Sequence, residues 1–469
     1  MKINRPTQTE LDQMSHAQKD ALILLLFDLL EQLEARVATV ENKVEKNSQN
    51  SSKPPSSEGL KKGAAHPRKA GEKPSGGQKG HQGTTRRMVD NPDATVICAP
   101  KGQCDCGALV NDLPQILVER RQQIDIPKPQ IIITEYQKFR AQCSCGKSHD
   151  GFFPHTVSPN VSYGARLKAY SVGLAQGHFV ALNRVAEIVN DQYGVCISVG
   201  SLQKWIICAS ERLTATYNAQ CETLVNAPVM HSDESGMRTE GKLYWLHVAA
   251  TDNVVHYSVH QQRGFEGMDA AGILPRFNGV VVHDCWKPYW HYEGITHALC
   301  NAHLLRELNY FEELTGQSWT GALKNTLING KKAVATAQQE GKTALAMAEL
   351  QAFKRDYDLQ IAQGLQAFPI APPKPKQRGR PKQHPATNLL IRLQTHKDAV
   401  LRFLEDWRVP FDNNLAERAV RCVKVKLKVT GGFRAMGGSE AFCIIRSIWE
   451  TDKLRSQNPF ETLRMVFSG

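Results

Sequence analysis

The first regular pattern along the chain is a hydrophobic repeat near its amino terminus. Apolar residues recur at alternating steps of three and four, at Ile23, Leu26, Leu30, Leu33, Val37, Val40 and Val44. This spacing is typical of a coiled coil, in which Arg36 and Glu41 fall where opposite charges of parallel chains can pair. We therefore predict a self-associating helix that ends near Asn47. Phe27 and Leu29 widen its apolar face, so packing against another domain is the alternative.

A second helical pattern covers residues 163–212 and includes two short helical segments joined by a turn. The segments at 184–194 and 199–206 have the proportions of a helix-turn-helix, with Gly194 ending the first and Ser198 capping the second. The second helix is then placed to enter a DNA major groove with Ser201, Gln203 and Lys204. The alternative is an ordinary pair of packed helices without a role in DNA reading.

After Ala227 the pattern changes from helical to strand-like. It predicts three strands at 228–233, 242–251 and 253–260, a helical stretch around 265–274, and a continuous apolar run at 279–284. A run of the last kind is typical of a strand that is buried on both faces. Three antiparallel strands, a crossover helix and a parallel strand are the opening of the ribonuclease-H fold. In that topology the first and fourth strands lie side by side.

Each of these two neighbouring strands is predicted to end in a carboxylate, at Asp233 and at Asp284. Acids on neighbouring strands repel each other unless cations lie between them. Carboxylate oxygens are ligands that Mg²⁺ or Mn²⁺ prefers, whereas histidines suit zinc better. Two such ions, roughly 4 Å apart, can activate the attacking oxygen and stabilise the leaving oxygen in phosphoryl transfer. The sequence therefore predicts a two-metal site between the two strands.

A third carboxylate is expected from a later helix that crosses the same part of the sheet. The candidate is Glu417, in the first or second turn of a helix that Asp412 or Asn413 can cap. Arg418 and Arg421 flank it, where they can hold phosphates beside the scissile bond. For any one acid, a solvated surface carboxylate is the alternative, and the prediction depends on all three together.

The chain contains twelve cysteines. In a reducing compartment we expect them to be free thiols or metal ligands rather than a disulfide framework. Four of them form two close pairs, Cys104 with Cys106 and Cys143 with Cys145, each followed by glycine. The pairs resemble the knuckles of a zinc ribbon, with strand-like segments at 115–126 and 130–139 between them, and we expect structural Zn²⁺ there. A single residue separates the cysteines of each pair instead of the usual two. A metal-free hairpin is therefore the alternative, and Cys98 is a possible substitute ligand.

The charge of the chain favours a polyanionic partner. Its formal net charge is +12 and its isoelectric point is near 9.1, with a basic, glycine-spaced cluster at 61–87. This cluster can lie along phosphates, or it can serve only as a soluble tether. The longest apolar run, at 21–27, is too short to cross a bilayer, and no secretion leader is evident, so we expect a cytosolic protein.

Several longer motifs resemble bacterial transposases of the insertion-sequence-sixty-six family, in their long catalytic subunit. The matching motifs are Asn-Ser-Ser-Lys-Pro-Pro-Ser-Ser at 50–57, Gly-Gly-Gln-Lys-Gly-His-Gln-Gly at 76–83, Ser-Val-Gly-Ser-Leu-Gln-Lys-Trp at 198–205, Cys-Asn-Ala-His-Leu-Leu-Arg-Glu-Leu at 300–308 and Asp-Asn-Asn-Leu-Ala-Glu-Arg at 412–418. With the coiled coil and the cysteine pairs, they cover nearly the whole chain. Two departures are Glu234-Ser235, where the family has Glu-Thr after its first aspartate, and the short cysteine spacing.

The resemblance implies a transposase of DDE type whose catalytic acids are Asp233, Asp284 and Glu417. It also implies small accessory proteins encoded beside this chain and a helical insertion before the last catalytic helix. A basic loop in that region contains Arg378, Arg380 and Lys382. It resembles the Arg-Gly-Arg-Pro hook that enters A/T-rich minor grooves, although a flexible basic loop without groove specificity is the alternative.

The fold class that we predict is α+β and multidomain, with a ribonuclease-H-like α/β catalytic core interrupted by a helical insertion. The predicted divisions are a coiled coil at 1–47, a basic Gly/Pro/Ser-rich linker at 48–92, a zinc-ribbon-like module at 93–158, a helix-turn-helix region at 159–222, the first part of the core at 223–310, the helical insertion at 311–402, the last helix region of the core at 403–450 and a C-terminal tail at 451–469.

The expected function is transposition in the bacterial cytoplasm, at the nucleoid, by a homo-oligomer that acts on its element ends and on target DNA. A DNA-binding regulator with an inert core is one alternative. A nuclease that cleaves without joining is another. His303, one turn before Glu307 on a predicted helix, can assist near the metals or be a buried structural histidine.

Overall fold

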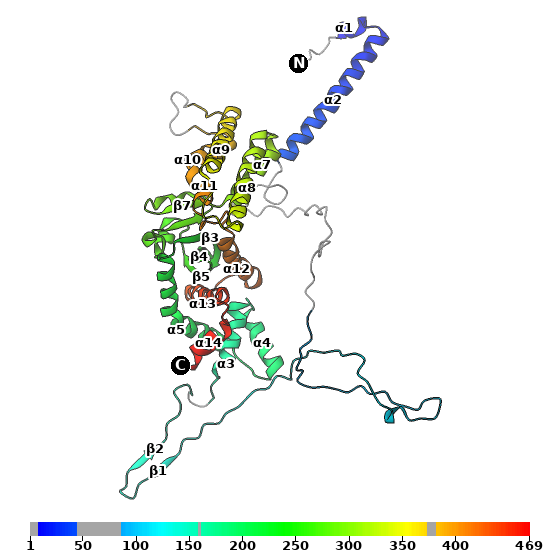
Figure 1. The fold of residues 1–469 in the computed structure, drawn as a ribbon. Helices are drawn as coiled ribbons and strands as arrows, with labels where there is room; N and C mark the ends of the chain where they lie inside the picture. Colours follow the sequence, from blue (N-terminus) through cyan, green and yellow to red (C-terminus); the bar gives the residue numbers. More distant parts are fainter. Residues whose placement is uncertain (1–7, 45–85, 158–160, 373–380) are drawn as a thin grey trace. The chain divides into compact units, whose positions relative to one another are not determined.

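The computed structural model describes residues 8–44, 86–157, 161–372 and 381–469 (Figure 1). By its contacts the chain divides into two units. One comprises Met1–Arg68 with Tyr136–Gly469, and the other is Lys69–Glu135. The first unit contains a mixed sheet with helices around it, so the chain is an α+β protein.

A five-stranded sheet forms the centre of the first unit. Its strands are β3 (Val229–Thr239), β4 (Lys242–Thr251), β5 (Val254–His260), β6 (Val280–His283) and β7 (Thr296–Leu299). They lie in the order β5-β4-β3-β6-β7. β3, β4 and β5 pair antiparallel, whereas β6 pairs parallel with both β3 and β7. The prediction that the first and fourth strands are neighbours is confirmed.

The first strand is longer than the sequence analysis predicted. We expected it to end at Asp233, but β3 continues to Thr239 because its antiparallel pairing with β4 continues to that residue. The parallel pairing of β3 with β6 stops earlier, at His231 opposite Val282. Asp233 therefore lies within β3, just beyond the point where β6 leaves it, and not at the end of its strand.

Helices cover both faces of the sheet and its outer strand. Met230 and Ala249 face a cluster that includes the end of α5 (Val199–Val225) and α6 (Phe265–Ala270). Met237 and Val248 face a second cluster with α12 (Asn414–Thr430) and α13 (Met436–Leu454). This alternation is the period of two expected of a strand buried on both faces.

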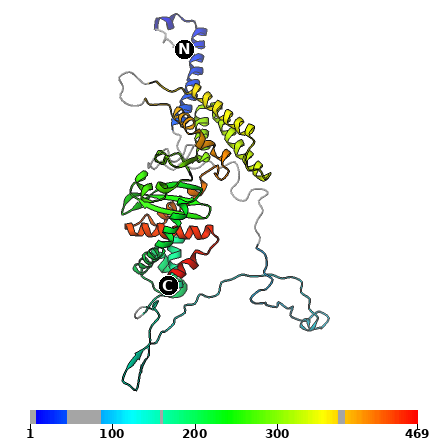
Figure 2. The same cartoon turned by 60° about the vertical axis from the view of Figure 1, so that its left-hand side comes forward.

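The outer strand β5 is covered by α13, which lies across the sheet in the turned view (Figure 2). Two side chains of α13 accept hydrogen bonds from N–H groups on the outer edge of β5, the side that faces away from β4. Ser447 Oγ accepts from Tyr257 N at 2.9 Å, and Thr451 Oγ1 accepts from Val255 N at 3.0 Å. The edge is thus closed against pairing with another chain.

Between β7 and α12 lies a region of five helices with a core of its own. They are α7 (Asn301–Thr315), α8 (Ser318–Gln339), α9 (Met347–Ala367), α10 (Pro385–Thr395) and α11 (Lys397–Glu405). Their core includes Leu308, Leu327, Tyr357 and Leu390. The mostly helical stretch predicted between Leu308 and Asp398 is therefore present in its described residues.

The helices that precede the sheet have the predicted turn. α4 (Leu182–Tyr193) ends at Gly194, whose φ is 68°, a conformation that glycine adopts without a steric penalty. Ser198 caps α5, since its Oγ accepts a hydrogen bond from Ser201 N at 3.0 Å. The second helix continues far beyond the predicted Ile206, to Val225, because its later turns pack on the sheet and on α13. α3 (Ala165–Val172) and α14 (Pro459–Ser468) pack beside it.

Near the amino terminus, α1 (Gln8–Gln13) and α2 (His16–Val44) are helical, as the heptad pattern predicted for α2. Ile23, Leu30 and Leu33 are exposed on α2. The predicted helix end near Asn47 and the basic cluster at 61–79 lie outside the described residues. No described helix combines the length and the apolar character needed to span a membrane.

The strands predicted at 115–126 and 130–139 are wrong. These residues are extended, but they pair with no neighbouring strand, and side chains such as Ile116 and Ile132 are exposed because nothing packs on them. Regular structure here is limited to a short helix, η2 (Val110–Asp112), in the second unit and to the hairpin of β1 (Arg140–Gln142) with β2 (Ser148–Asp150) in the first.

Packing between a π-helical turn and α13 gives a test of the core. A Cβ atom added to Gly177, in η3 (Gly173–Gly177), would lie 2.3 Å from Cζ2 of Trp449. We expect Gly177→Ala to lower the free energy of unfolding by about 1–3 kcal/mol, because the indole cannot move without disturbing the core. Urea unfolding followed by circular dichroism measures the change. Gly200→Ala, where a Cβ meets only Ser198 Oγ at 3.7 Å, is the control and should be nearly neutral.

Candidate active site

Two aspartates meet where β6 leaves β3. Asp233 lies in β3, and Asp284 follows β6 directly. Burial, and then the negative charges of Asp284 and Glu417, together raise the pKa of Asp233 to about 7. Their backbone surroundings hold them in place, since Asp233 Oδ1 accepts from Glu234 N at 2.8 Å and Asp284 Oδ1 accepts from Trp286 N at 3.0 Å. The structure thus brings together acids that are far apart in sequence.

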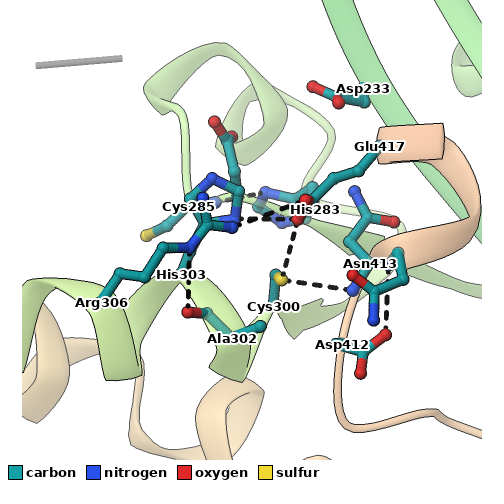
Figure 3. Close-up of polar contacts among 12 residues, drawn as sticks. Asp233, His283, Cys285, Cys300, Ala302, His303, Arg306, Asp412, Asn413 and Glu417 are labelled. Carbon is teal, nitrogen blue, oxygen red and sulfur yellow. Dashed lines mark hydrogen bonds and ion pairs between the residues drawn. The ribbon is translucent and has the colours of Figure 1, made fainter. Parts of the chain in front are cut away.

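The third acid, Glu417, comes from the first turn of α12 (Figure 3). Its Oε1 lies 3.2 Å from Nδ1 of His303, and its Oε2 lies 3.5 Å from a guanidinium nitrogen of Arg306. Contact with His303, and then the charge of Arg306, lowers the pKa of Glu417 to about 2 against the opposing effect of burial. Both partners come from α7, so the helical region after β7 contributes directly to the site.

Asn413 ties the start of α12 to β3, and the sequence analysis missed this role. We expected Asp412 or Asn413 to cap the helix with its side chain. The Asp412 carboxylate does accept from Asn414 N at 3.2 Å. The buried side chain of Asn413 instead donates from Nδ2 to Ser232 O at 2.8 Å, and its Oδ1 lies 2.8 Å from His231 Nδ1. These bonds fix the first turn of α12 beside the residue that precedes Asp233.

A buried ion pair lies next to Asp233 and was also missed. Glu234 accepts hydrogen bonds from Arg263 Nη2 at 2.7 Å and from the Tyr289 hydroxyl at 2.9 Å. The Arg263 guanidinium lies over the rings of Trp245, at 4.8 Å, and Trp286, at 4.0 Å. Trp286 is two residues after Asp284, so this cluster joins the backbone segments that carry both aspartates. A surface glutamate could not have been distinguished from this one by sequence pattern alone.

Backbone strain is present directly after Asp284. Cys285 has φ of 70°, which costs energy for a residue with a Cβ atom and often marks functional sites. Its N–H donates to His283 Nδ1 at 3.1 Å. The turn that presents Asp284 is therefore held by side chains on both sides of the acid.

Basic residues line the exposed side of α12. Arg418 and Arg421 are exposed, as their proposed role with phosphates requires. Lys424 is a further candidate that the sequence analysis did not single out. Its Nζ lies 3.4 Å from Gly236 O, and its charge interacts favourably with Asp233. The spacing of seven residues from Glu417 places it on the same helix face, which is the sequence feature that could have identified it.

The other predicted binding residues belong to α5 and to the segment before α10. In α5 the Ser201 hydroxyl contacts the capping Ser198, whereas Gln203 and Lys204 are exposed. Lys382 is exposed, and Arg378 and Arg380 lie outside the described residues.

The cysteine pairs form two similar turns, in which Gly107 N donates to Cys104 O at 2.8 Å and Gly146 N donates to Cys143 O at 2.9 Å. Cys104 and Cys106 belong to one unit, and Cys143 and Cys145 to the other. The zinc site stays a prediction.

The part of the chain that contains the three acids is similar to known proteins. Residues 160–441, more than half of the chain and all three acids, match the model of a transposase family, so the protein belongs to the nucleic-acid-processing enzymes. The chain is a member of the Transposase IS66 family, which confirms the resemblance seen in its motifs. This membership implies DNA binding and the use of divalent metal ions.

Two further similarities carry no functional description. Residues 3–87 match a family described as a Family of unknown function (DUF6444). The chain is also 23% identical, over 428 residues, to the "Uncharacterized protein y4qI" of Sinorhizobium fredii (strain NBRC 101917 / NGR234). That similarity covers 86% of this chain and 76% of the relative.

The pair of Glu234 with Arg263 gives a prediction on stability. Arg263→Ala should lower the free energy of unfolding by about 3 kcal/mol, because it leaves a buried carboxylate without its partner. Adding Glu234→Gln should recover part of the loss, since the uncompensated charge is then gone. Urea unfolding of the single and double variants measures both effects.

Arg276→Ala is the matched control, because the ion pair of Arg276 with Glu222 is exposed and its loss should change the free energy of unfolding much less than the loss of Arg263 does. A double variant no more stable than Arg263→Ala would contradict the assignment of the loss to the unpaired charge.

Proposed function

We propose that this protein is a DDE-type transposase that cleaves DNA at the ends of its element and joins them to target DNA. The observation that carries the proposal is the convergence of Asp233, Asp284 and Glu417, from β3, from the end of β6 and from α12. Burial, and then the negative charges of Asp284 and Glu417, raise the pKa of Asp233 to about 7.

The strand order supports a ribonuclease-H-like core. An antiparallel β3-β4-β5 set, with β6 added parallel to β3 after the short α6, is the opening that we predicted for that fold. The helices α7 to α11 come between β7 and α12, as expected of an insertion before the last catalytic helix. We propose that the chain is organised, in this order, as a coiled coil, a linker, a cysteine module, a helix-turn-helix region, an interrupted core and a C-terminal tail.

The donor set fits hard divalent cations. Asp233, Asp284 and Glu417 offer carboxylate oxygens, the ligands that Mg²⁺ and Mn²⁺ prefer. Cations held there would relieve the repulsion that raises the pKa of Asp233. When bound, two such ions supply Lewis-acid activation of the attacking oxygen and stabilisation of the leaving oxygen.

The residues of the chain position the DNA around these acids. We propose that Arg418, Arg421 and Lys424, on α12, hold the phosphates on either side of the scissile bond. A water oxygen attacks the phosphorus, the bond to the 3′ oxygen breaks, and a 3′-hydroxyl is left at the element end. That hydroxyl attacks a phosphorus of the target as the target's own bond to its 3′ oxygen breaks. The strands are thus joined, the target is left with a free 3′-hydroxyl, and no covalent protein intermediate forms.

Other parts of the chain are proposed to recognise DNA and to assemble the complex. Gln203 and Lys204 are exposed on α5, which supports major-groove binding. Arg378, Arg380 and Lys382 are proposed to enter a minor groove, and the cysteine pairs to hold a structural Zn²⁺. We further propose dimerisation through α2, partnership with small accessory proteins, and action at the bacterial nucleoid.

Substitution of one acid tests the reaction. Asp284→Asn should lower cleavage of labelled element-end DNA by about 10²- to 10³-fold or more, because the proposed metal site loses a charged ligand and the cations that stabilise the transition state are held less well. Binding of the same DNA should remain largely intact. The measurement is a magnesium-dependent cleavage and joining assay with a target plasmid, together with a gel-shift titration.

Asp252→Asn, in the exposed turn between β4 and β5, is the control and should keep both activities. Cleavage that survives Asp284→Asn would remove this residue from the site. Binding without cleavage by the unmodified protein would indicate a regulator, and cleavage without joined product a nuclease.

Self-association is tested at the apolar heptad positions of α2, which form the seam of the predicted coiled coil. Leu30 lies at a core heptad position and Leu24 lies off the seam, yet both are exposed in the single chain, by 53% and 65%. Leu30→Asp should dissociate the oligomer, whereas Leu24→Asp should leave it intact. Sedimentation velocity measures both species. Equal behaviour of the two variants would contradict a coiled-coil interface on this seam.

A further inference from the structure

Three side chains of different chemistry form a compact group beside the proposed catalytic acids. They are Cys300 and His303, at the start of α7, and Glu417 in α12, and their ligand atoms all lie within 4.8 Å of one another. The side chains of Cys300 and His303 both approach Oε1 of Glu417. Figure 3 shows them pointing toward it from the α7 side.

The distances in this group match the edges of a tetrahedral zinc site. Zinc lies about 2.3 Å from sulfur and about 2.0–2.1 Å from nitrogen or oxygen, so tetrahedral ligands are about 3.5 Å apart for S···O and about 3.3 Å for N···O. The observed separations are 3.5 Å from Cys300 Sγ to Glu417 Oε1 and 3.2 Å from His303 Nδ1 to the same oxygen. The ligands would need little movement to bind the ion.

The ring nitrogen of His303 that faces Glu417 is poorly satisfied by hydrogen bonds. His303 Nδ1 is buried and makes no aligned hydrogen bond with any described residue, although it lies at ion-pair distance from Glu417. A buried ring nitrogen without a hydrogen bond is costly unless something else binds it. This nitrogen lies close to the sulfur and the carboxylate, which is the position of a metal ligand.

Backbone contacts hold Cys300 in place. Cys300 occupies the N-cap of α7, and its N–H donates to His283 O at 2.9 Å. Its sulfur also accepts a hydrogen bond from the backbone N–H of Asn413 at 3.2 Å. Such a bond is the kind of outer-shell contact that orients a metal ligand.

We propose that Cys300, His303 and Glu417 form a Zn²⁺ site that excludes the hard catalytic cations. Thiolate and imidazole are good ligands for zinc and poor ones for magnesium. Zinc would take Oε1 of Glu417, while Oε2 faces Arg306 at 3.5 Å. Zinc at Oε1 would then compete with a catalytic ion for the carboxylate of Glu417. Zinc therefore acts as an inhibitor of DNA cleavage, and this consequence rests on the proposed function. The binding of zinc does not depend on that function.

Binding is tested on the full chain without DNA, using Co²⁺ as a spectroscopic probe for zinc. Cys300→Ser and His303→Gln should each lose one equivalent of bound Co²⁺, and Cys300→Ser should also lose part of the thiolate charge-transfer absorption. Cys221→Ser, which removes a half-buried thiol from α5, is the control and should bind as the unmodified chain does. Circular dichroism verifies that each variant is folded.

If either ligand variant keeps the full stoichiometry while folded, the proposed site is overturned. The same conclusion follows if the unmodified chain and Cys300→Ser give identical cobalt spectra. Because no DNA is present, these outcomes do not depend on whether the protein is a transposase.

Inhibition is tested in the magnesium-dependent cleavage assay. For each protein, the cleavage rate with zinc is divided by its own rate in magnesium alone, so that differences in basal activity do not matter. The Zn²⁺ concentration that halves cleavage should rise by at least about 10-fold in Cys300→Ser, the loss that even an outer-shell change can cause. It should stay unchanged in Cys221→Ser. An equal inhibitory concentration in all three proteins would overturn the competition for Glu417.

Discussion

Asp233 and Asp284 lie where β6 leaves β3, and burial removes much of the water that would otherwise screen their charges. Burial, together with the nearby charges of Asp284 and Glu417, raises the pKa of Asp233 to about 7. Like charges can be held this close only by a framework that resists their separation. The hydrogen bonds, ion pairs and packed helices around them form that framework, so the repulsion explains much of the local structure.

The framework has two parts. On one side, Asn413 joins the start of α12 to β3 through Ser232 and His231, which fixes the position of Glu417. On the other side, the buried Glu234 pairs with Arg263, whose guanidinium lies over the rings of Trp245 and Trp286. These contacts are buried and directional, whereas the basic residues proposed to meet DNA are exposed. Rigid acids and accessible cationic side chains suit a site that must accept a long polyanion.

The helical region between β7 and α12 belongs to the site as well as to the scaffold. α7 supplies His303 and Arg306, which contact opposite oxygens of Glu417, and Cys300 at its N-cap. Movement of α7 relative to α12 would therefore change the environment of the third acid. This connection gives the region a way to affect chemistry without supplying one of the three predicted acids.

Local periodicity in the sequence determined the existence of α2, the turn between α4 and α5, and the strands β4, β5 and β6, because these patterns repeat within a few residues. It also determined which acids to consider, since Asp284 follows a run of buried valines and Glu417 follows residues suited to a helix start. It failed at 115–126 and 130–139, where alternating residues form no sheet, because pairing requires a partner that a local pattern does not specify. Only the tertiary structure decided that β3 continues past Asp233, that Asn413 bonds to β3, and that Glu234 lies against Arg263. Each of these depends on segments separated by many residues, and their meeting is set by packing of the whole sheet and its helices.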